Sequence, residues 1–405
     1  MADNNENKVL NVPHLRFPEF TEEWEETTLG KISEITKGSG ISKDQLSEQG
    51  SPCILYGELY TKYKSEIIDE VYSRTELDSS SLVKSKANDV IIPCSGETAI
   101  DISTARCVPF NNILLGGDLN IIRLKHDDGG FFAYQLNGAR KKDIARVAQG
   151  VSVVHLYGEN LKHIRVYHPA IEEQKKITRL LSLIDERIAT QNKIIEDLKK
   201  LKSAISKHLF TRKDLLETTI CLSEIATLRN GYAFQSSKYN ALGKWKILTI
   251  TNVSGERHIN DEDCNCIINL PDDIQDHQVL KEGDILISLT GNVGRVSLCK
   301  DGDYLLNQRV GLLQLAKNVN QEFLYQILSS QKFENSMIAC GQGAAQMNIG
   351  KGDVESYVLP YSSNGNNILW IAKILHSYDE CIINEQRRLT LLTMQKQYLL
   401  TQMFI

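Results

Sequence analysis

The amino-acid sequence contains a long segment that occurs twice. Residues 177–210 can be laid over residues 371–404 without a gap, at a constant offset of 194 positions (371 minus 177). The overlay brings identical residues together at several points: Leu181 and Leu375, Asp185 and Asp379, Ile188 and Ile382, Leu198 and Leu392, Lys202 and Lys396. Self-similarity at a fixed period marks a structural unit that is used more than once. The chain is therefore expected to fold as two related parts.

Upstream of each copy, shorter landmarks recur in the same order. They are Ile32–Ile35 and Leu222–Ile225, Asn88–Ser103 and Gly283–Ser297, Phe131–Leu136 and Glu322–Ile327, and Gln149-Gly150 and Gln342-Gly343. Short apolar runs bounded by turn residues, such as Val90–Ile92 and Ile285–Ile287, predict strands, whereas residues 131–139 and 321–330 predict helices. Each repeat is thus predicted to be a globular α+β domain followed by one long helix.

In each long helix the apolar residues recur at intervals of four and three, which is the spacing of a coiled-coil seam. The seam positions are Ile177, Leu181, Ile184, Ile188, Gln191, Ile195 and Leu198 in the first helix and Ile371, Leu375, Tyr378, Ile382, Glu385, Leu389 and Leu392 in the second. Each helix would be about 50 Å long at 1.5 Å per residue, too long to bury its stripe within one small domain. We expect the two stripes to bury each other in an antiparallel coiled coil with pseudo-two-fold symmetry. Packing of each helix on its own domain is the alternative.

Two seam positions are polar and equivalent, Gln191 and Glu385. A polar seam residue costs stability but disfavours slipped pairings, so these two are predicted to fix the register of the helices. The resulting segments are a first domain at 1–168, a central helix at 169–212, a second domain at 213–363 and a C-terminal helix at 364–405.

Composition excludes several classes of protein. The 405 residues are 41% hydrophobic and 24% charged, as in an ordinary globular protein, and nine scattered cysteines form no C-x-x-C pair. No run of about 18 apolar residues occurs, so no membrane span is expected and the chain is predicted to be cytoplasmic. The net charge of −5 counts against a nucleic-acid binder that acts alone.

The ordered set of motifs resembles a known family. The segment "AIEEQKKITRLLSLIDERIATQNKIIEDLKKL", the N-terminal "VPHLRFPEFTEEW" and the pieces "GDILIS", "GNVG", "NQRVGLL" and "GQG" are similar to segments of the specificity subunit of type I restriction-modification systems. The resemblance covers essentially the whole chain. It implies two target recognition domains that each read one part of a split double-stranded DNA target, while the helices fix the gap.

The resemblance also implies partners. Two modification (methyltransferase) subunits would dock on the helices, and restriction/translocase subunits would complete the complex. S-adenosylmethionine, ATP and Mg would be bound by those partners, so no cofactor is expected in this chain.

The residues independently argue against catalysis here. None of the eight prolines adjoins another, so the Asn/Asp-Pro-Pro-aromatic signature of amino-methyltransferases is absent. Lys43 and Gln346 stand where a G-x-G-x-x-G turn needs glycine, and Gly352 stands where a P-loop needs Ser or Thr. No two histidines have the H-x-x-x-H spacing that would suggest a metal site.

Candidate DNA contacts in the first domain lie in "ARKKDIARVAQGVSVVH" (Ala139 to His155). Sequence readout needs side chains that form paired hydrogen bonds with base edges, whereas any positive or polar group can hold phosphate. The candidates are Arg140, Lys141, Lys142 and Arg146, followed by Gln149 and Ser152. A solvated basic face is an equally good interpretation.

Candidates in the second domain lie in three stretches that contain or adjoin glycine. They are Arg229, Asn230 and Tyr232, then Asn292 and Arg295, then Asn307, Gln308 and Arg309, with Gln342 at a further glycine turn. An ordinary hairpin and core packing of the aromatic rings are the alternatives. Because "NSMIACG" replaces the basic cluster of the first domain, the two halves are expected to bind DNA unequally.

Two rival functions remain. In one, the domains bind proteins and the helices set the distance between them, so that the chain is a non-catalytic scaffold. In the other, the chain is a self-contained nuclease or methyltransferase, which the missing motifs disfavour.

Overall fold

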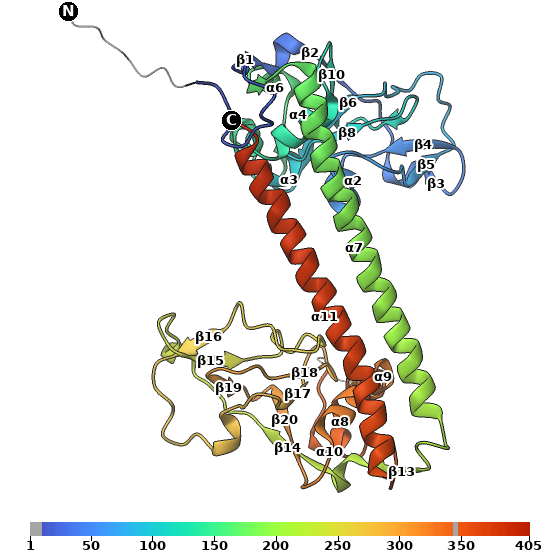
Figure 1. Ribbon diagram of the computed structural model, residues 1–405, viewed down its shortest axis with the longest axis vertical. Coiled ribbons are helices and arrows are strands. Elements are labelled where there is room, and N and C mark those ends of the chain that lie inside the picture. Colours follow the sequence, from blue (N-terminus) through green and yellow to red (C-terminus); the bar gives the residue numbers. More distant parts are fainter. Residues whose placement is uncertain (1–9, 343–346) are drawn as a thin grey trace, which may run out of the picture. The chain divides into compact units, whose positions relative to one another are not determined.

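The computed structural model describes residues 10–342 and 347–405 of the chain (Figure 1). These residues form two compact units. Unit 1 comprises the chain up to Asn192 together with Arg387–Ile405, and unit 2 comprises Lys193–Gln386. Each unit therefore contains one globular domain and a part of both long helices.

The secondary structure of unit 1 starts with strand β1 and runs into the first half of the long helix α7. The end of the second long helix, α11, also belongs to unit 1. Its strands are β1 (Glu25–Thr28), β2 (Ser33–Lys37), β3 (Leu46–Ser47), β4 (Ser51–Ile54), β5 (Ser73–Thr75), β6 (Asp89–Pro93), β7 (Ser95–Gly96), β8 (Arg106–Val108), β9 (Leu114–Leu115), β10 (Leu119–Leu124), β11 (Val154–His155) and β12 (Arg165–His168). Its helices are α1 (Leu29–Ile32), α2 (Glu58–Thr61), α3 (Ala99–Ile102), α4 (Gly129–Asn137), α5 (Lys141–Val147), α6 (Gly158–Lys162), the start of α7 (Ile171–Thr211) and one 3-10 turn, η1 (Lys43–Gln45).

Unit 2 has fewer elements than unit 1. Its strands are β13 (Thr218–Cys221), β14 (Ala226–Asn230), β15 (Trp245–Leu248), β16 (Asn265–Ile267), β17 (Ile285–Ser288), β18 (Val296–Leu298), β19 (Tyr304–Leu306), β20 (Val310–Leu315) and β21 (Val358–Tyr361). Its helices are α8 (Gln321–Leu328), α9 (Gln331–Gly341), α10 (Lys351–Glu355) and the start of α11 (Gly365–Gln402), with 3-10 turns η2 (Leu222–Glu224), η3 (Ser236–Lys238) and η4 (Asp276–Gln278).

The sheets of the two units share one topology. Unit 1 has a sheet in the order β2-β10-β6-β8 and unit 2 has β14-β20-β17-β18, while β1-β12 corresponds to β13-β21. A second sheet in each unit contains one parallel pair, β4 with β9 and β15 with β19. The mixed α and β character predicted for both domains is confirmed. The strand order of the main sheet, which the sequence did not predict, is the same in both units, whereas the second sheet has one more strand in unit 1.

Local sequence explains why the repeats share this register. Asn88 and Gly283 precede β6 and β17 and both have positive φ, 80° and 85°, a conformation that favours Gly and Asn. The helices that follow β10 and β20 have a side-chain cap, since Asp128 accepts a hydrogen bond from the Phe131 amide and Asn320 accepts one from the Phe323 amide. The same turn and the same cap therefore begin the same elements in both units.

The long helices run antiparallel within each unit. In unit 1, Leu400 and Phe404 near the end of α11 belong to one buried cluster with Ile177 and Leu181 of α7. In unit 2, Leu209 of α7 clusters with Ile371 and Leu375 of α11. The predicted antiparallel arrangement of the helices is confirmed within each unit. The clusters also include domain residues from α4 and α8, so the start of each helix packs on its own domain as well.

Every predicted seam position is buried or half-buried. Those that are less than 9% exposed are Ile177, Leu181, Ile184, Ile195, Ile371, Leu375 and Ile382, and Ile188, Leu198, Tyr378, Leu389 and Leu392 are half-buried. Gln191 is 9% exposed and Glu385 is half-buried. Their role in fixing the register stays a prediction.

Candidate functional site: two sheet edges and two ion clusters

Three predicted stretches of unit 2 meet at one edge of the sheet β14-β20-β17-β18. β14 ends at Asn230, which pairs with Gly311, and β17 ends at Ser288, which pairs with Val310. The end of β14, the turn after β17 and the turn before β20 therefore lie side by side at the same edge of the sheet. We call this surface, formed by Arg229, Asn230, Tyr232, Asn292, Arg295, Asn307, Gln308 and Arg309, the unit 2 edge.

Backbone hydrogen bonds hold the turns of the unit 2 edge together. The Gln308 amide donates to the Tyr232 carbonyl at 3.0 Å, and the Leu289 amide donates to the Arg309 carbonyl at 3.0 Å. The Gly291 amide donates to the Met347 carbonyl at 2.9 Å, which brings in the segment after α9. Gln342 is exposed at the end of α9, and Gly343, its neighbour in the predicted turn, lies outside the described residues.

Several side chains of the unit 2 edge are free to face a ligand and others are engaged. Asn292, Gln308 and Arg309 are exposed. Arg229 donates to Gln314 at 2.7 Å, and the Tyr232 hydroxyl donates to Asp273 at 2.7 Å. The hydrogen bond to Asp273 and, to a lesser extent, burial raise the pKa of Tyr232, so this hydroxyl stays protonated at neutral pH.

The equivalent edge of unit 1 follows from the same sheet register. β2 ends at Lys37, which pairs with Asn120, and β6 ends at Pro93, which pairs with Leu119. The hairpin that carries Gln149 and Ser152 is attached here, because β11 pairs with β7. The structure thus places Gln149 and Ser152, both exposed, beside this surface.

Sequence reasoning missed three members of the unit 1 edge. By strand register, Lys37 corresponds to Asn230, Glu97 to Asn292 and Asp118 to Arg309, and all three unit 1 residues are exposed. The signal was present, because the overlay of "SGETA" on "TGNVG" sets Glu97 opposite Asn292. We define the unit 1 edge as Lys37, Glu97, Asp118, Gln149 and Ser152.

The four basic candidates of unit 1 lie on and beside α5 and differ in their surroundings. Arg140 is half-buried, donates to an oxygen of Ile405 and lies 5.2 Å from the centre of the Tyr167 ring. Burial lowers the pKa of Lys141. Lys142 and Arg146 are exposed, the latter paired with Asp143 at 2.9 Å. Within this cluster, Lys142 and Arg146 are therefore the two side chains that solvent, and so phosphate, can reach.

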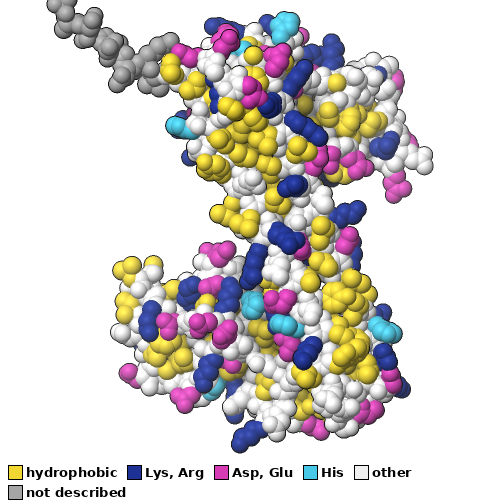
Figure 2. All heavy atoms as spheres, in the orientation of Figure 1, with side chains coloured by type: hydrophobic (Ala, Val, Ile, Leu, Met, Phe, Trp, Pro, Cys, Tyr) yellow, Lys and Arg dark blue, Asp and Glu magenta, His cyan; other side chains and the backbone are white. Residues whose placement is uncertain are grey.

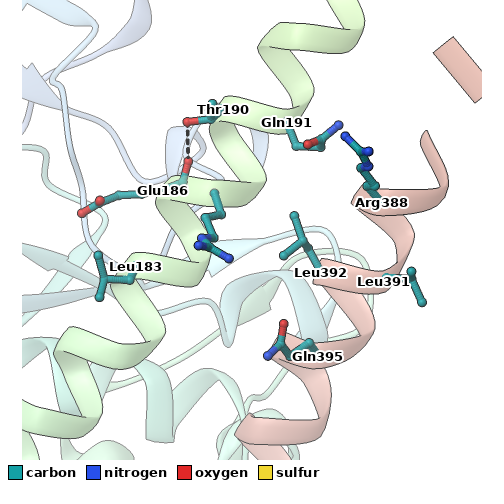
Figure 3. A pocket seen from close by; sticks show the side chains of 9 residues that line it. Leu183, Glu186, Thr190, Gln191, Arg388, Leu391, Leu392 and Gln395 are labelled. Carbon is teal, nitrogen blue, oxygen red and sulfur yellow. Dashed lines mark hydrogen bonds between the residues drawn. The ribbon is translucent and has the colours of Figure 1, made fainter. Parts of the chain in front are cut away.

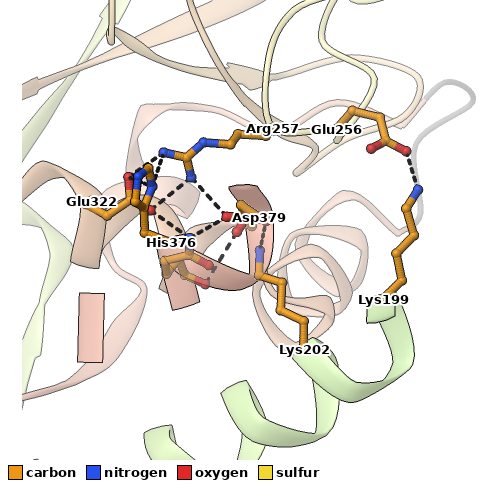
Figure 4. Close-up of polar contacts among 9 residues, drawn as sticks. Lys199, Lys202, Glu256, Arg257, Glu322, His376 and Asp379 are labelled. Carbon is orange, nitrogen blue, oxygen red and sulfur yellow. Dashed lines mark hydrogen bonds and ion pairs between the residues drawn. The ribbon is translucent and has the colours of Figure 1, made fainter. Parts of the chain in front are cut away.

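A buried ion cluster joins the two helices and the domain of unit 2 (Figure 4). Asp379 of α11 accepts from Lys202 of α7 at 2.5 Å and from Arg257 at 2.9 Å. Arg257 also donates to both oxygens of Glu322 on α8, at 2.9 and 2.6 Å, and Gln326 donates to Asp379 at 2.6 Å. We call these residues clamp 2.

The protonation of clamp 2 is set by its own charges. Burial lowers the pKa of Arg257, but the hydrogen bond with Glu322 and the charges of Glu322 and Asp379 outweigh it, so the pKa is raised. Burial likewise raises the pKa of Glu322, but the bonds from Arg257 and Gln326 leave it lowered. Both groups are therefore ionised at neutral pH.

A corresponding cluster, clamp 1, lies in unit 1. Asp185 of α7 pairs with Lys396 of α11 at 2.6 Å, and Lys396 also pairs with Glu66 at 2.5 Å. The Tyr134 hydroxyl of α4 donates to Asp185 at 2.7 Å and the Ser65 hydroxyl donates to it at 3.0 Å. Burial and, to a lesser extent, the charge of Asp185 raise the pKa of Tyr134. The repeated Asp and Lys of the sequence overlay are thus the helix residues of both clamps.

An open groove of about 650 Å³ lies between the parts of α7 and α11 that belong to unit 1 (Figure 3). It is lined by Leu183, Glu186, Arg187, Thr190, Gln191, Arg388, Leu391, Leu392 and Gln395. Leu391 is 65% exposed, and Met394 and Tyr398, one and two turns further along α11, are 62% and 59% exposed. Apolar side chains at this spacing form a face that another helix can cover.

Other kinds of site find no support in the described part of the chain. On the face in Figure 2, basic and acidic side chains are interspersed over both units. Among residues 10–342 and 347–405, no group of three or more His, Cys, Asp or Glu side chains is placed to hold a metal ion. No helix within those ranges combines the length and apolarity needed to cross a bilayer.

Comparisons with known proteins agree with this duplicated architecture. A family model described as type I restriction modification DNA specificity domain matches residues 21–200 and again 217–394. The chain is 25% identical over 352 residues to the type I restriction enzyme MjaVIII specificity subunit of Methanocaldococcus jannaschii, covering 80% of this chain and 78% of the relative. It is 26% identical over 249 residues to the putative MjaX specificity subunit of the same organism, covering 57% and 56%.

Solved structures share the fold. A type I restriction-modification S subunit from M. genitalium superposes with a TM-score of 0.62 at 18% identity, covering 97% of this chain and 99% of the other. A chain from a structural study of complex assembly and conformational transition of the type I system superposes with a TM-score of 0.56 at 15% identity, covering 93% and 96%.

Proposed function

The chain belongs to the type I restriction-modification DNA specificity family, whose domain it contains twice, and on that premise we propose that it reads a split DNA target through the unit 1 and unit 2 edges. Each edge would contact one half of the target. Specificity subunits are non-catalytic, so we assign no reaction to this chain. Methyl transfer and cleavage belong to partner subunits, which would bind S-adenosylmethionine, ATP and Mg.

The observation that carries this proposal is the gathering of hydrogen-bonding side chains at equivalent edges of the two sheets. Arg and Lys recognise guanine, Asn and Gln recognise adenine, and Glu and Asp accept from the cytosine amino group. Arg309 and Asn292 on the unit 2 edge stand where Asp118 and Glu97 stand on the unit 1 edge. The two edges therefore offer different chemistry, as the readers of two different half-sites must.

The same arrangement supports roles for the helices and the partners. An antiparallel pair of helices, held by apolar seams and clamps within each unit, would set the number of base pairs between the half-sites. The exposed apolar face on α11 and the adjacent groove are suited to dock a modification subunit. Since the chain has a net charge of −5, the partners would supply much of the phosphate neutralisation that dominates affinity. Binding by the chain alone should be weak and salt-sensitive.

The test is co-expression with the cognate modification subunit, followed by mapping of methylated adenines in the host DNA. The proposal predicts methylation at one bipartite, asymmetric sequence with a constant gap. Methylation at a single continuous sequence, at random, or not at all would contradict it. Retention of duplex DNA at low salt by the assembled complex separates this function from a protein scaffold, for which the complex would be indifferent to DNA.

A matched pair of variants localises the readout. Arg309→Ala removes an exposed cation from the unit 2 edge, and Lys317→Ala removes one from the opposite end of β20, about 20 Å away along the strand. The first should lose about 1–3 kcal/mol of discrimination at one base pair of one half-site. The second should leave the mapped sequence unchanged.

A further inference from the structure

The two clamps contain residues that are structurally equivalent but opposite in charge. The Cys107 amide donates to the Glu66 carbonyl at 2.8 Å, and the Leu298 amide donates to the Arg257 carbonyl at 2.7 Å. Cys107 of β8 and Leu298 of β18 are themselves equivalent, since they face Val90 of β6 and Ile285 of β17 in sheets of the same order. Glu66 and Arg257 therefore occupy the same position in the two domains.

The helix residues of the clamps do not change between the units. Asp185 pairs with Lys396, and Asp379 pairs with Lys202, so both helices supply one Asp and one Lys at the same offset of 194 positions. These four side chains are largely buried, with 8% to 18% of the side chain exposed. The two helices thus present the same Asp–Lys ion pair to each of two domains that differ.

The domains compensate for the reversed charge at other positions. In unit 1, Arg106 lies on β8 where Ser297 lies on β18; it is buried, and the charges of Glu66 and Asp185 oppose the lowering of its pKa by burial. In unit 2, Glu322 stands in the first turn of α8, whereas the first turn of α4 has no acidic residue. Unit 1 therefore adds one anion and one cation to the helix pair, Glu66 and Arg106, and unit 2 adds Arg257 and Glu322. Counted over these Asp, Glu, Lys and Arg side chains, each clamp has no net charge, which lowers the cost of burying them.

We propose that the Asp–Lys pair of the helices is the same attachment point for both recognition domains. Glu66 and Arg257 are the positioning residues that hold each domain on the helices in the orientation that reads its half-site. The proposal rests on the proposed function of the chain. The sign at this position is free to change, provided that a second domain residue restores neutrality.

The geometry of Arg257 shows why this contact fixes an orientation. Its guanidinium reaches Asp379 on α11 and both oxygens of Glu322 on α8, and it lies 5.0 Å from the centre of the Tyr325 ring. A planar group bound at several points resists rotation, whereas a single ammonium contact does not. The loop that carries Arg257 also joins the sheet β16-β15-β19 to β18, because the Ile259 amide donates to the Leu298 carbonyl at 3.0 Å. Arg257 thereby ties both sheets of the domain to the helices.

The experiment transplants the charges of clamp 1 into unit 2 within the full complex of this chain and its modification subunit. Arg257→Glu alone sets a third carboxylate against Asp379 and Glu322, and we expect methylation of the mapped target to fall by about tenfold or more. The triple variant Arg257→Glu, Ser297→Arg, Glu322→Phe installs the two charges of the unit 1 domain and removes the first-turn carboxylate that α4 lacks. It should recover the rate to within about threefold. Lys213→Glu, an exposed change of the same sign, is the control and should behave as the wild type.

A milder variant covers the case in which Arg257→Glu does not fold. Arg257→Lys keeps the charge but replaces the planar guanidinium, which binds both oxygens of Glu322, with a single ammonium group. We therefore expect a folded complex that methylates about threefold or more slowly and accepts gaps of neighbouring length. Wild-type rate and gap for Arg257→Lys, or no recovery in the triple variant, would overturn the proposal.

Hydrogen exchange of the β15 and β16 amides in unit 2 provides a readout that does not depend on DNA. Protection should fall in Arg257→Glu and return in the triple variant. If the wild-type complex recognises no split target, the proposed function fails, while this exchange pattern still tests whether the clamp holds the domain. Unchanged protection in Arg257→Glu would refute the clamp itself.

Discussion

Clamp 1 and clamp 2 show which parts of a duplicated chain must stay the same and which can diverge. The helix residues Asp185 and Asp379 each accept from a lysine of the other helix, because both helices take part in both units. Each domain, in contrast, contacts only its own clamp. A change of charge in one domain can therefore be compensated by a second change in that domain. A change of charge in a helix residue of a clamp would have to be compensated by the other helix or by the domain.

The unit 1 and unit 2 edges differ for another reason. Their backbones share one strand register, yet Asp118 stands where Arg309 does and Glu97 stands where Asn292 does. Exposed positions at the end of a strand carry no packing constraint, so their chemistry is free to follow a ligand. Within each unit, the helix residues of the clamp are thus the same, whereas the residues of the edge differ.

Removal of the clamp aspartates should reveal the largest difference in stability between the two units. Asp379→Ala leaves Lys202 and Arg257 buried without their shared anion, and we expect unit 2 to lose about 3–5 kcal/mol of stability. Asp185→Ala should cost less, because Lys396 retains Glu66 and the other donors to Asp185 are the neutral hydroxyls of Tyr134 and Ser65.

Hydrogen exchange resolved by unit measures both aspartate changes in the same experiment. Glu380→Ala, exposed and adjacent to Asp379, is the control for loss of a carboxylate from α11. Equal losses for Asp379→Ala and Asp185→Ala would contradict the difference between the clamps.

The apolar part of the seam should respond equally in the two units. Leu181 and Leu375 are equivalent and both are 0% exposed, so truncation of either to Ala should cost about 2–5 kcal/mol in its own unit. Ile188 is half-buried, and its truncation to Ala should cost less. Denaturant unfolding of the three variants measures the differences, and a larger effect at Ile188 than at Leu181 would show that the seam is wrongly placed.

The tyrosines beside the clamps should respond unequally. The Tyr134 hydroxyl donates to Asp185 at 2.7 Å, and a hydrogen bond to a charged acceptor contributes about 1.5–3 kcal/mol. In unit 2, Gln326 and Arg257 donate to the corresponding oxygen of Asp379. We therefore expect Tyr134→Phe to destabilise unit 1 more than Tyr325→Phe destabilises unit 2. The reverse order in thermal unfolding would contradict these assignments.

The smallest expected difference between the two units is in how their stability depends on pH. His168 of unit 1 pairs with Asp127 at 3.2 Å, and Tyr361 occupies its position in unit 2. The hydrogen bond to Asp127 raises the pKa of His168 above 6.5, against a smaller opposing effect of burial. Burial of Asp127 opposes ionisation, but the bonds from His168 and Gln174 leave its pKa below 3.8.

The signs of these two shifts define where the pair stabilises unit 1. The contribution of His168 is fully present below pH 6.5 and is lost as the pH rises through its folded pKa, and that of Asp127 is present above pH 3.8 and is lost in acid. Hydrogen exchange from pH 5 to pH 8 should show unit 1 losing protection in the wild type but not in His168→Gln. An identical pH profile for both proteins would exclude the pair as the cause.

The sequence predicted the frame better than the site. The period of the seam and the fixed offset of 194 placed the helices and their buried faces, because apolar spacing alone determines which helix faces are buried. The role of Asp185 and Lys396 as clamp residues could not be predicted, since their partners Glu66 and Tyr134 are distant in sequence and no local pattern links them. Glu97 and Asp118 were missed because basic and amide side chains were expected at a DNA surface, and acidic acceptors were not considered.

The most direct test of the central claim, that the helices separate two independent readers, is to lengthen both helices and map methylation. One heptad would be added to α7 between Asp185 and Lys202 and to α11 between Asp379 and Lys396, so that the seam period and both clamps are retained. The added length of about 10 Å corresponds to about three base-pair steps. We predict a gap that is about three base pairs wider between two unchanged half-sites. An unchanged gap in an active complex, or an altered half-site, would contradict the account.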